Sequence, residues 1–120
     1  MAYKDFTEMD VWKIGFSQVI ELYAITKSFP AEERYGLISD IKRAANSVTN
    51  NIAEGFGRYE RKDKTRFYKI SRGSCYELIN QMLTSCQLGF IKEQESNKII
   101  TNYKNIIAGL DALIKSIETN

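Results

Sequence analysis

A line of polar side chains in segment 43–54 holds residue types that catalyse reactions or recognise ligands. Four members are spaced by four, three and four residues and a fifth lies beside them: Arg43, Ser47, Asn50 and Glu54, then Asn51. This spacing places them on one side of a helix. The cluster could form a catalytic or recognition site, or a hydrogen-bond network that fixes the alignment of two helices.

We favour the structural network, because the chain contains no histidine that could activate its serines. Arg43 and Glu54 are three helical turns apart, so each needs a partner from another helix. We expect Glu77 to pair with Arg43 and Arg72 to pair with Glu54. The predicted network comprises Arg43, Ser47, Asn50, Asn51, Glu54 and Glu77.

A second candidate is the basic segment 57–72, which carries seven basic and two acidic residues in a chain of net charge +2. Tyr59, Phe67 and Tyr68 lie among the basic residues. Cationic side chains bind phosphates and aromatic rings stack on bases, so the segment could contact RNA or DNA. The alternative is a solvated helix start with internal ion pairs, such as Asp63 with Arg66. The candidate nucleic-acid-binding residues are Arg58, Arg61, Lys62, Lys64, Arg66, Lys69 and Arg72.

Other site chemistries find little support in the residue types. Cys75 and Cys86 would lie roughly 16 Å apart along one helix, too far for a disulfide, so we expect reduced, packed thiols. Without histidine, the carboxylates cannot form the Glu-x-x-His pattern of di-iron bundles. Gly55 and Gly57 lack the spacing of a phosphate-binding loop and indicate a helix end. We expect no catalytic residue, no metal, no cofactor and no enzymatic activity.

Helical periodicity supplies the elements that must position these residues. Apolar residues recur at three- and four-residue spacing in four segments, which predicts helices at about 8–28, 37–56, 63–88 and 93–118. Pro30 ends the first helix, because it disfavours helical geometry at the residue before it. With short connections, the fold class is all-α, an antiparallel up-down-up-down four-helix bundle. The length of 120 residues fits a single domain over residues 1–120.

The faces of the first and fourth helices indicate what each buries. On the first helix, one face carries Val11, Gly15, Val19, Leu22 and Thr26. Aromatic residues flank that face and make the stripe broad enough to meet two neighbours: Trp12, Phe16 and Tyr23. The fourth helix has an apolar stripe of Ile99, Tyr103, Ile106, Leu110, Leu113 and Ile117.

The third helix has two apolar faces. One face carries Phe67, Ser74, Leu78, Met82 and Ser85. The opposite side carries the candidate oligomer interface, Tyr76, Ile79 and Leu83. A single bundle covers only one of these faces, so the second indicates self-association. The alternative is scattered exposed apolar residues, which are common on soluble proteins.

The compartment follows from what the chain lacks. No apolar run approaches the roughly 20 residues that cross a bilayer. The first ten residues are acidic and polar where a signal peptide needs a basic start and an apolar stretch. We therefore expect a cytoplasmic protein with no membrane contact.

Several motifs together resemble a known family. These are Phe29-Pro30, Glu33 to Leu37, Arg43-Ala44-Ala45 with Ser47-Val48, Asn51 to Gly55 with Arg58, Arg66-Phe67-Tyr68, Gly73-Ser74 with Glu77-Leu78, and Leu88 to Ile91. Over roughly residues 8–117 the chain resembles the bacterial four-helix-bundle family of 23S rRNA intervening-sequence proteins. Asn-Ile-Ala-Glu-Gly, in register with Arg-Ala-Ala upstream, is the most specific part of the resemblance.

The resemblance implies a four-helix protomer that assembles into a ring-like pentamer. A relative of this family, the accessory variability determinant of diversity-generating retroelements, is a basic pentamer that works with a reverse transcriptase and nucleic acid. We therefore predict a non-enzymatic, self-associating helical scaffold, with RNA or DNA contact as a hypothesis for the basic surface around residues 58–72. The alternative is a protein–protein assembly factor with no nucleic-acid role, whose partner is another protein.

Overall fold

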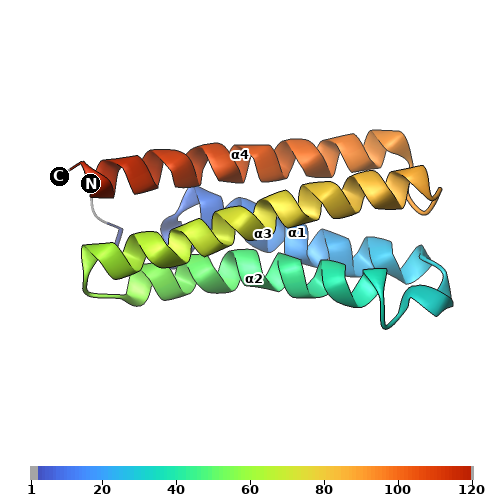
Figure 1. The fold of residues 1–120 in the computed structure, drawn as a ribbon, viewed down its shortest axis with the longest axis horizontal. Coiled ribbons are helices and arrows are strands. Elements are labelled where there is room, and N and C mark those ends of the chain that lie inside the picture. The colour runs from blue at the N-terminus through green and yellow to red at the C-terminus, as the bar shows by residue number, and fades with distance from the viewer. Residues whose placement is uncertain (1–2, 120) are drawn as a thin grey trace.

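Four long helices build the molecule (Figure 1). This computed structural model describes residues 3–119. The helices are α1 (Asp10–Ile25), α2 (Leu37–Gly57), α3 (Arg61–Gln87) and α4 (Glu93–Glu118). Short 3₁₀ turns adjoin the first two helices: η1 (Phe6–Glu8), η2 (Thr26–Ser28) and η3 (Ala31–Glu33). The prediction of an all-α four-helix protein is confirmed, and every helix end lies within three residues of its predicted position.

The helix ends follow from local chemistry. After α1 the chain tightens into η2 and then becomes extended at Phe29 (φ −70°, ψ 155°), directly before Pro30. At the end of α3, Gly89 adopts a φ of +80°, which favours glycine. The N–H of Gly89 donates to the Cys86 carbonyl at 3.0 Å and that of Phe90 to the Ser85 carbonyl at 2.9 Å. These two bonds form a Schellman motif and satisfy the last carbonyls of α3.

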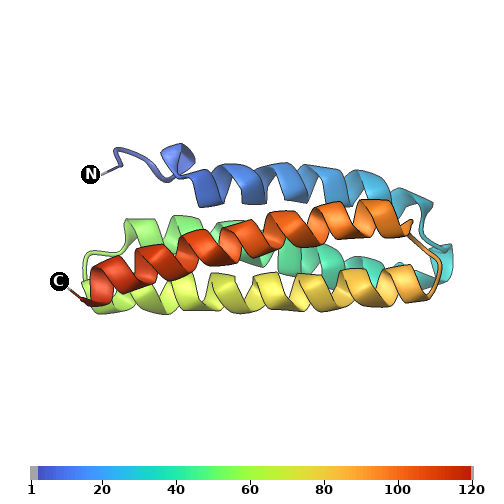
Figure 2. The same cartoon turned by 90° about the horizontal axis from the view of Figure 1, so that it is seen from above.

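Consecutive helices run in opposite directions along the molecule (Figure 1). Each helix packs against the next in sequence, and α4 also packs against α1. Figure 2, seen from above, places α1 and α3 on opposite sides of α4. The helices therefore follow one another around the bundle, and α1 lies diagonally across from α3. In this arrangement the border between α1 and α2 lies on the opposite side of the bundle from the border between α3 and α4.

The core lies along the inner faces of the four helices. On α4, Ile99, Tyr103, Ile106 and Leu110 are fully buried, as predicted. Leu113 and Ile117 are only half-buried, whereas Ile114 is buried. No helix within residues 3–119 is both long and apolar enough to cross a membrane.

One member of each of two predicted stripes is replaced by a neighbouring residue, and the other members are buried as predicted. On α1, Gln18 is buried and Val19 is half-buried, because the core-facing positions 11, 15, 18 and 22 keep a four-three-four spacing. On α3, Tyr68 is buried at 3% exposure and Phe67 is half-buried, which is the reverse of the prediction. The buried seam of α3 is Tyr68, Ser71, Cys75, Leu78 and Met82, a heptad-like spacing.

Candidate functional site

Two basic side chains of the segment 57–72 bind the carbonyl ends of other helices. The Arg61 guanidinium donates to the Ile117 carbonyl at 2.6 Å, at the end of α4. The Lys64 ammonium donates to the Phe56 carbonyl at 2.8 Å, at the end of α2. Both cations lie where the helix dipole is negative and the last carbonyls lack helical partners. These two hydrogen bonds stabilise the ends of α4 and α2, and this structural role accounts for the positions of Arg61 and Lys64.

Three more cations of this segment form ion pairs. Arg58 pairs with Glu54 at 2.7 Å, within the same turn of chain. Lys69 pairs with Glu118 and Arg72 with Asp111, both at 2.6 Å, and these two pairs join α3 to α4. The side-chain hydrogen bond to Asp111 and the attraction of its charge raise the pKa of Arg72. Within residues 3–119, Lys62 and Arg66 are the cations of this segment with no carboxylate or carbonyl partner.

The aromatic rings of the segment differ in their availability for stacking. Tyr59 is fully open to solvent at 99% exposure. The half-buried Phe67 ring lies 4.7 Å from the guanidinium carbons of both Arg58 and Arg66. Tyr68 is buried, and this burial raises its pKa to about 12. The expectation that Tyr68 could stack on a base is therefore wrong, because its ring belongs to the core.

The predicted polar line on α2 separates into two parts. Arg43 binds Glu77 on α3, as expected, and this hydrogen bond raises the pKa of Arg43. The Ser47 hydroxyl lies 2.8 Å from that of Ser74. The Asn51 amide donates to the Ser47 carbonyl at 2.8 Å and to its hydroxyl at 3.1 Å. Arg43, Ser47, Asn51 and Glu77 thus form contacts within α2 and between α2 and α3.

Two members of the predicted network lie outside it. Glu54 pairs with Arg58 and not with Arg72, because the helix end brings Arg58 within one turn of Glu54. Arg72 turns instead to Asp111 on α4. Asn50 is exposed, and within the described residues its side chain makes no hydrogen bond to another residue. The prediction for Asn50 and the Glu54–Arg72 pair is therefore wrong.

The candidate oligomer interface on α3 is accessible. The exposed fractions of Tyr76 and Leu83 are 49% and 56%, and Ile79 is half-buried. The Arg72 guanidinium covers the Tyr76 ring at 5.2 Å while it binds Asp111 on α4. This contact places the apolar side chains on the part of α3 that borders α4. We name Tyr76, Ile79 and Leu83 the α3 face.

A second apolar surface was missed by the sequence analysis. Trp12, Phe16, Val19 and Tyr23 repeat the four-three-four spacing of the core seam, one residue further along α1. The exposed fraction of Phe16 is 48%, and that of neighbouring Ile20 is 58%. The expectation that the stripe on α1 meets two helices is confirmed, because α1 packs against both α2 and α4, but Phe16 remains half exposed at the border with α2. The repeated heptad-like spacing was the signal that could have revealed a second seam.

These side chains border a groove between α1 and α2. The groove is lined by Phe6, Trp12, Phe16, Val19, Asn46, Thr49, Asn50 and Ala53. The Trp12 and Phe16 rings stack at 4.8 Å, and Phe6 meets Trp12 edge-on at 5.5 Å. Tyr23 continues the line, and its hydroxyl accepts a 3.0 Å hydrogen bond from Asn46 on α2. We name this surface the α1/α2 groove.

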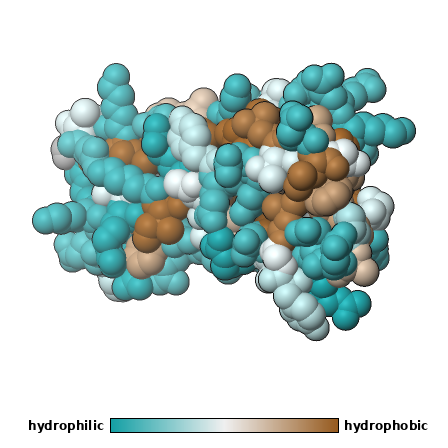
Figure 3. All heavy atoms as spheres, turned by 45° about the vertical axis from the view of Figure 1, so that its right-hand side comes forward, coloured by the Kyte–Doolittle hydropathy of each residue, from teal (hydrophilic) through white to brown (hydrophobic). Residues whose placement is uncertain are grey.

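The α1/α2 groove and the α3 face lie on opposite sides of the bundle, because the first borders α2 and the second borders α4. The face of the molecule seen in Figure 3 is mainly hydrophilic, and apolar side chains appear on it as separate patches. Exposed apolar patches on a soluble protein are typical of surfaces that bind a partner, and this small bundle has two of them.

The reactive residue types are buried or dispersed. Both cysteines are free, and burial raises the pKa of the Cys75 thiol to about 12, so it stays protonated. Within residues 3–119 no three metal-binding side chains are grouped together. The chemistry that the described surface supports is binding through apolar faces and free cations.

Comparisons with known proteins agree with the resemblance noted in the sequence. A family model described as 23S rRNA-intervening sequence protein matches residues 7–112. No protein with a curated description matches the chain.

The fold also has a counterpart among solved structures. A crystal structure of a protein of unknown function from the S23 ribosomal protein family of Bacteroides thetaiotaomicron VPI-5482 is similar, with a TM-score of 0.81. The two sequences are 18% identical, and the match covers 88% of this chain and 95% of that one. At this identity the similarity shows a shared fold.

Proposed function

Starting from the fact that this chain belongs to the family of 23S rRNA-intervening sequence proteins, we propose that it is a non-enzymatic, self-associating helical scaffold. It acts in the cytoplasm as one domain over residues 1–120. The single observation that carries this proposal is the presence of two different apolar faces on opposite sides of the bundle. Each face leaves large apolar side chains open to water, and association would bury them.

The two faces differ in shape and composition, which favours a head-to-tail contact. The α1/α2 groove is a hollow bordered by stacked aromatic rings, whereas the α3 face carries Tyr76, Ile79 and Leu83 on a helix. In a head-to-tail contact, the α3 face of one protomer packs into the α1/α2 groove of the next. Repetition of such a contact generates a ring when the rotation closes. The pentamer implied by the family resemblance is a ring of this kind.

The expected result in solution is a particle five times the mass of the 13.8 kDa protomer. Placing a carboxylate in the α1/α2 groove with Phe16→Glu, or on the α3 face with Leu83→Glu, buries an unpaired charge in the contact and should give monomers. Light scattering coupled to size exclusion measures the mass. Asn105→Glu, on the exposed side of α4, is the matched control and should stay assembled. A monomeric parent protein at micromolar concentration would refute the proposal.

A mixing experiment tests the head-to-tail arrangement itself. The Phe16→Glu protein keeps an intact α3 face, and the Leu83→Glu protein keeps an intact α1/α2 groove. Mixed in equal amounts, they can restore one contact, so a species of twice the protomer mass should appear. If each face instead paired with itself, each variant alone would already form a dimer through its intact face, and mixing would add no new mass. Far-ultraviolet circular dichroism on each variant confirms that the bundle is intact.

A second candidate function is a protein–protein assembly factor with no nucleic-acid role. The observation in its favour is that five of the seven candidate nucleic-acid-binding cations already bind carboxylates or carbonyls of this chain. RNA or DNA contact through the basic segment would rest mainly on Lys62 and Arg66, together with the exposed Tyr59 ring.

A further inference from the structure

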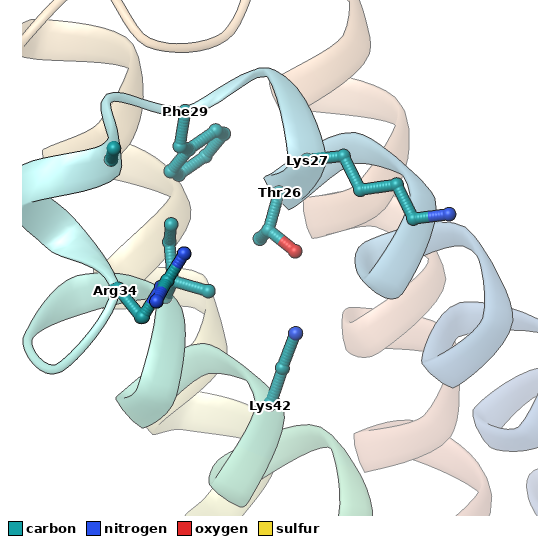
Figure 4. Close-up of a pocket in the computed structure, with 7 residues that line it drawn as sticks. Thr26, Lys27, Phe29, Arg34 and Lys42 are labelled. Carbon is teal, nitrogen blue, oxygen red and sulfur yellow. The ribbon is translucent and has the colours of Figure 1, made fainter.

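A pocket of about 290 Å³ lies in the turn between α1 and α2, at the end of the bundle remote from the basic segment 57–72 (Figures 1 and 4). The chain reverses here through η2, the extended Phe29-Pro30 and η3. Seven residues line the pocket, and three of them are basic: Lys27, Arg34 and Lys42. None of the seven is acidic, so the lining carries a charge of +3.

These three cations differ from those of the basic segment. Within residues 3–119, none of them forms an ion pair with a carboxylate. Lys42 and Arg34 instead lie against aromatic rings, the ammonium of Lys42 at 4.7 Å from the Tyr23 ring and the Arg34 guanidinium carbon at 6.0 Å from the Tyr35 ring. An aromatic face holds a cation in place without neutralising it. Their charge therefore remains available to a ligand.

Three carboxylates lie near this turn in the sequence: Glu32, Glu33 and Asp40. Glu33 accepts a hydrogen bond from the backbone N–H of Leu37 at the start of α2, at 3.3 Å. Glu32 and Asp40 form no ion pair within residues 3–119, and none of these three carboxylates lines the pocket.

The side chains are arranged around a common space (Figure 4). The Lys42 ammonium points toward the Thr26 hydroxyl, and the Arg34 guanidinium lies on the other wall, whereas the Lys27 ammonium points away. Phe29 and Thr26 form the floor of the pocket, and both are packed into the core, with exposed fractions of 5% and 2%. The Thr26 hydroxyl donates to the Leu22 carbonyl at 2.7 Å, and this hydrogen bond fixes the position of the hydroxyl oxygen at the end of α1. A guanidinium and an ammonium over a buried floor suit a compact anion with several oxygen acceptors.

We propose that this pocket binds a phosphate group, held between Arg34 and Lys42, with Lys27 adding attraction from its rim. Arg34 supplies planar paired donors and Lys42 a point charge, which is the division of roles seen in phosphate recognition. The phosphate could belong to a small phosphorylated molecule or to the backbone of a single-stranded RNA, because both present the same oxygens. No residue that lines this pocket lines the α1/α2 groove or belongs to the α3 face, although Lys42 contacts Tyr23 at the end of the groove.

The test is a titration of the full-length protein, followed by two-dimensional amide NMR at low salt, with pyrophosphate as the first probe. Saturable shifts are expected in residues 26–42 and should weaken as salt screens the charges. Arg34→Gln with Lys42→Gln should lower the affinity by at least about tenfold, because two charge-assisted hydrogen bonds are lost. The control, Lys98→Gln with Lys115→Gln, removes the same charge from α4 and should leave the affinity unchanged.

A short single-stranded RNA of mixed sequence is the second probe and distinguishes the source of the phosphate. RNA binding that shifts residues 26–42 and is lost in the Arg34→Gln/Lys42→Gln protein, without pyrophosphate binding, assigns the site to a polymer backbone. Pyrophosphate binding alone assigns it to a small molecule. The proposal is overturned if neither probe shifts residues 26–42, or if the α4 control lowers the affinity as much as the pocket variant does. Thermal melts confirm that both variants remain folded.

Discussion

At the scale of single residues, the close approach of α2 and α3 depends on one missing side chain. A Cβ at Gly55 would lie 2.7 Å from Cε1 of Tyr68 and 3.1 Å from the Lys64 carbonyl oxygen. The Tyr68 ring therefore packs directly on the α2 backbone. Gly55 and Gly57 are predicted to mark the end of the helix near residue 56, and α2 does end at Gly57 with Gly55 in its last turn.

Gly55→Ala should lower the free energy of unfolding by about 1–3 kcal/mol, because the new methyl group overlaps the Tyr68 ring and a backbone oxygen. Gly73→Ala is the matched control, since a Cβ at this position within α3 meets nothing within 4 Å. The control should raise stability by about 0.5–1 kcal/mol through helix propensity. Urea denaturation of both variants measures the difference. Equal effects at the two positions would contradict the packing role of Gly55.

Ionisable side chains in the core are neutral, and this makes the fold sensitive to alkali. Burial raises the pKa of Tyr68 from 10.0 to about 12 and that of Cys75 from 9.0 to about 12. Above about pH 9 the unfolded chain loses these protons while the folded chain keeps them, so the free energy of unfolding should fall as the pH rises toward 12. Stability from these groups is fully present below pH 9.

Tyr68→Phe keeps the ring and removes its ionisable hydroxyl, so the alkaline loss of stability should become smaller in this variant. Denaturant unfolding from about pH 8 to about pH 11 gives the slope for each protein. Comparison of slopes separates the protonation effect from any constant change in stability. An unchanged slope would show that the Tyr68 hydroxyl titrates normally in the folded protein.

At the scale of elements, hydrogen bonds and ion pairs connect the helices unevenly. The α2–α3 contact combines the Arg43–Glu77 pair with the serine pair and with a buried bond from the Ser71 hydroxyl to the Val48 carbonyl at 2.8 Å. The α3–α4 contact uses exposed ion pairs, which contribute little individually. Specific alignment of α2 with α3 therefore rests on the half-buried bonds.

Asn51→Ala should lower the free energy of unfolding by about 1 kcal/mol, because it removes the amide that binds the Ser47 hydroxyl and carbonyl. Glu54→Ala should cost less than about 0.5 kcal/mol, because its partner Arg58 is an exposed residue directly after the end of the same helix. The sequence analysis gave Asn51 and Glu54 the same structural role, whereas the structure predicts a larger loss of stability for Asn51→Ala. Thermal denaturation of the two variants under identical buffer conditions ranks them, and a larger loss for Glu54→Ala would contradict the structure.

At the scale of the whole molecule, charge is distributed differently from its distribution along the sequence. The basic segment 57–72 is largely offset by Glu54, Asp111, Glu118 and two helix ends. Free cations remain at Lys62 and Arg66, and at the pocket between α1 and α2. The long-range attraction between the protein and a polyanion depends on where these charges lie in the folded molecule, and not on their order along the sequence.

Nucleic-acid binding by the basic segment should therefore depend on its unpaired cations. Lys62→Ala with Arg66→Ala should weaken binding of a single-stranded RNA more than Lys69→Ala with Arg72→Ala, although both pairs remove the same charge. Fluorescence anisotropy at two salt concentrations measures the affinities. Equal losses would show that the ion-paired cations are as available as the free ones, and absence of binding at low salt would favour the assembly factor without a nucleic-acid role.

The sequence by itself determined the four helices, their ends within three residues, the core of α4 and the family, because helical periodicity and turn residues act locally. Only the tertiary structure decided which of Phe67 and Tyr68 is buried, because one residue of phase depends on the helix packed opposite. It also decided which cations are free, since contacts such as Arg61 with the Ile117 carbonyl join residues 56 positions apart. The α1/α2 groove and its position opposite the α3 face exist only after the helices pack together, because the spacing along α1 indicates a second apolar seam but not whether a neighbouring helix covers it.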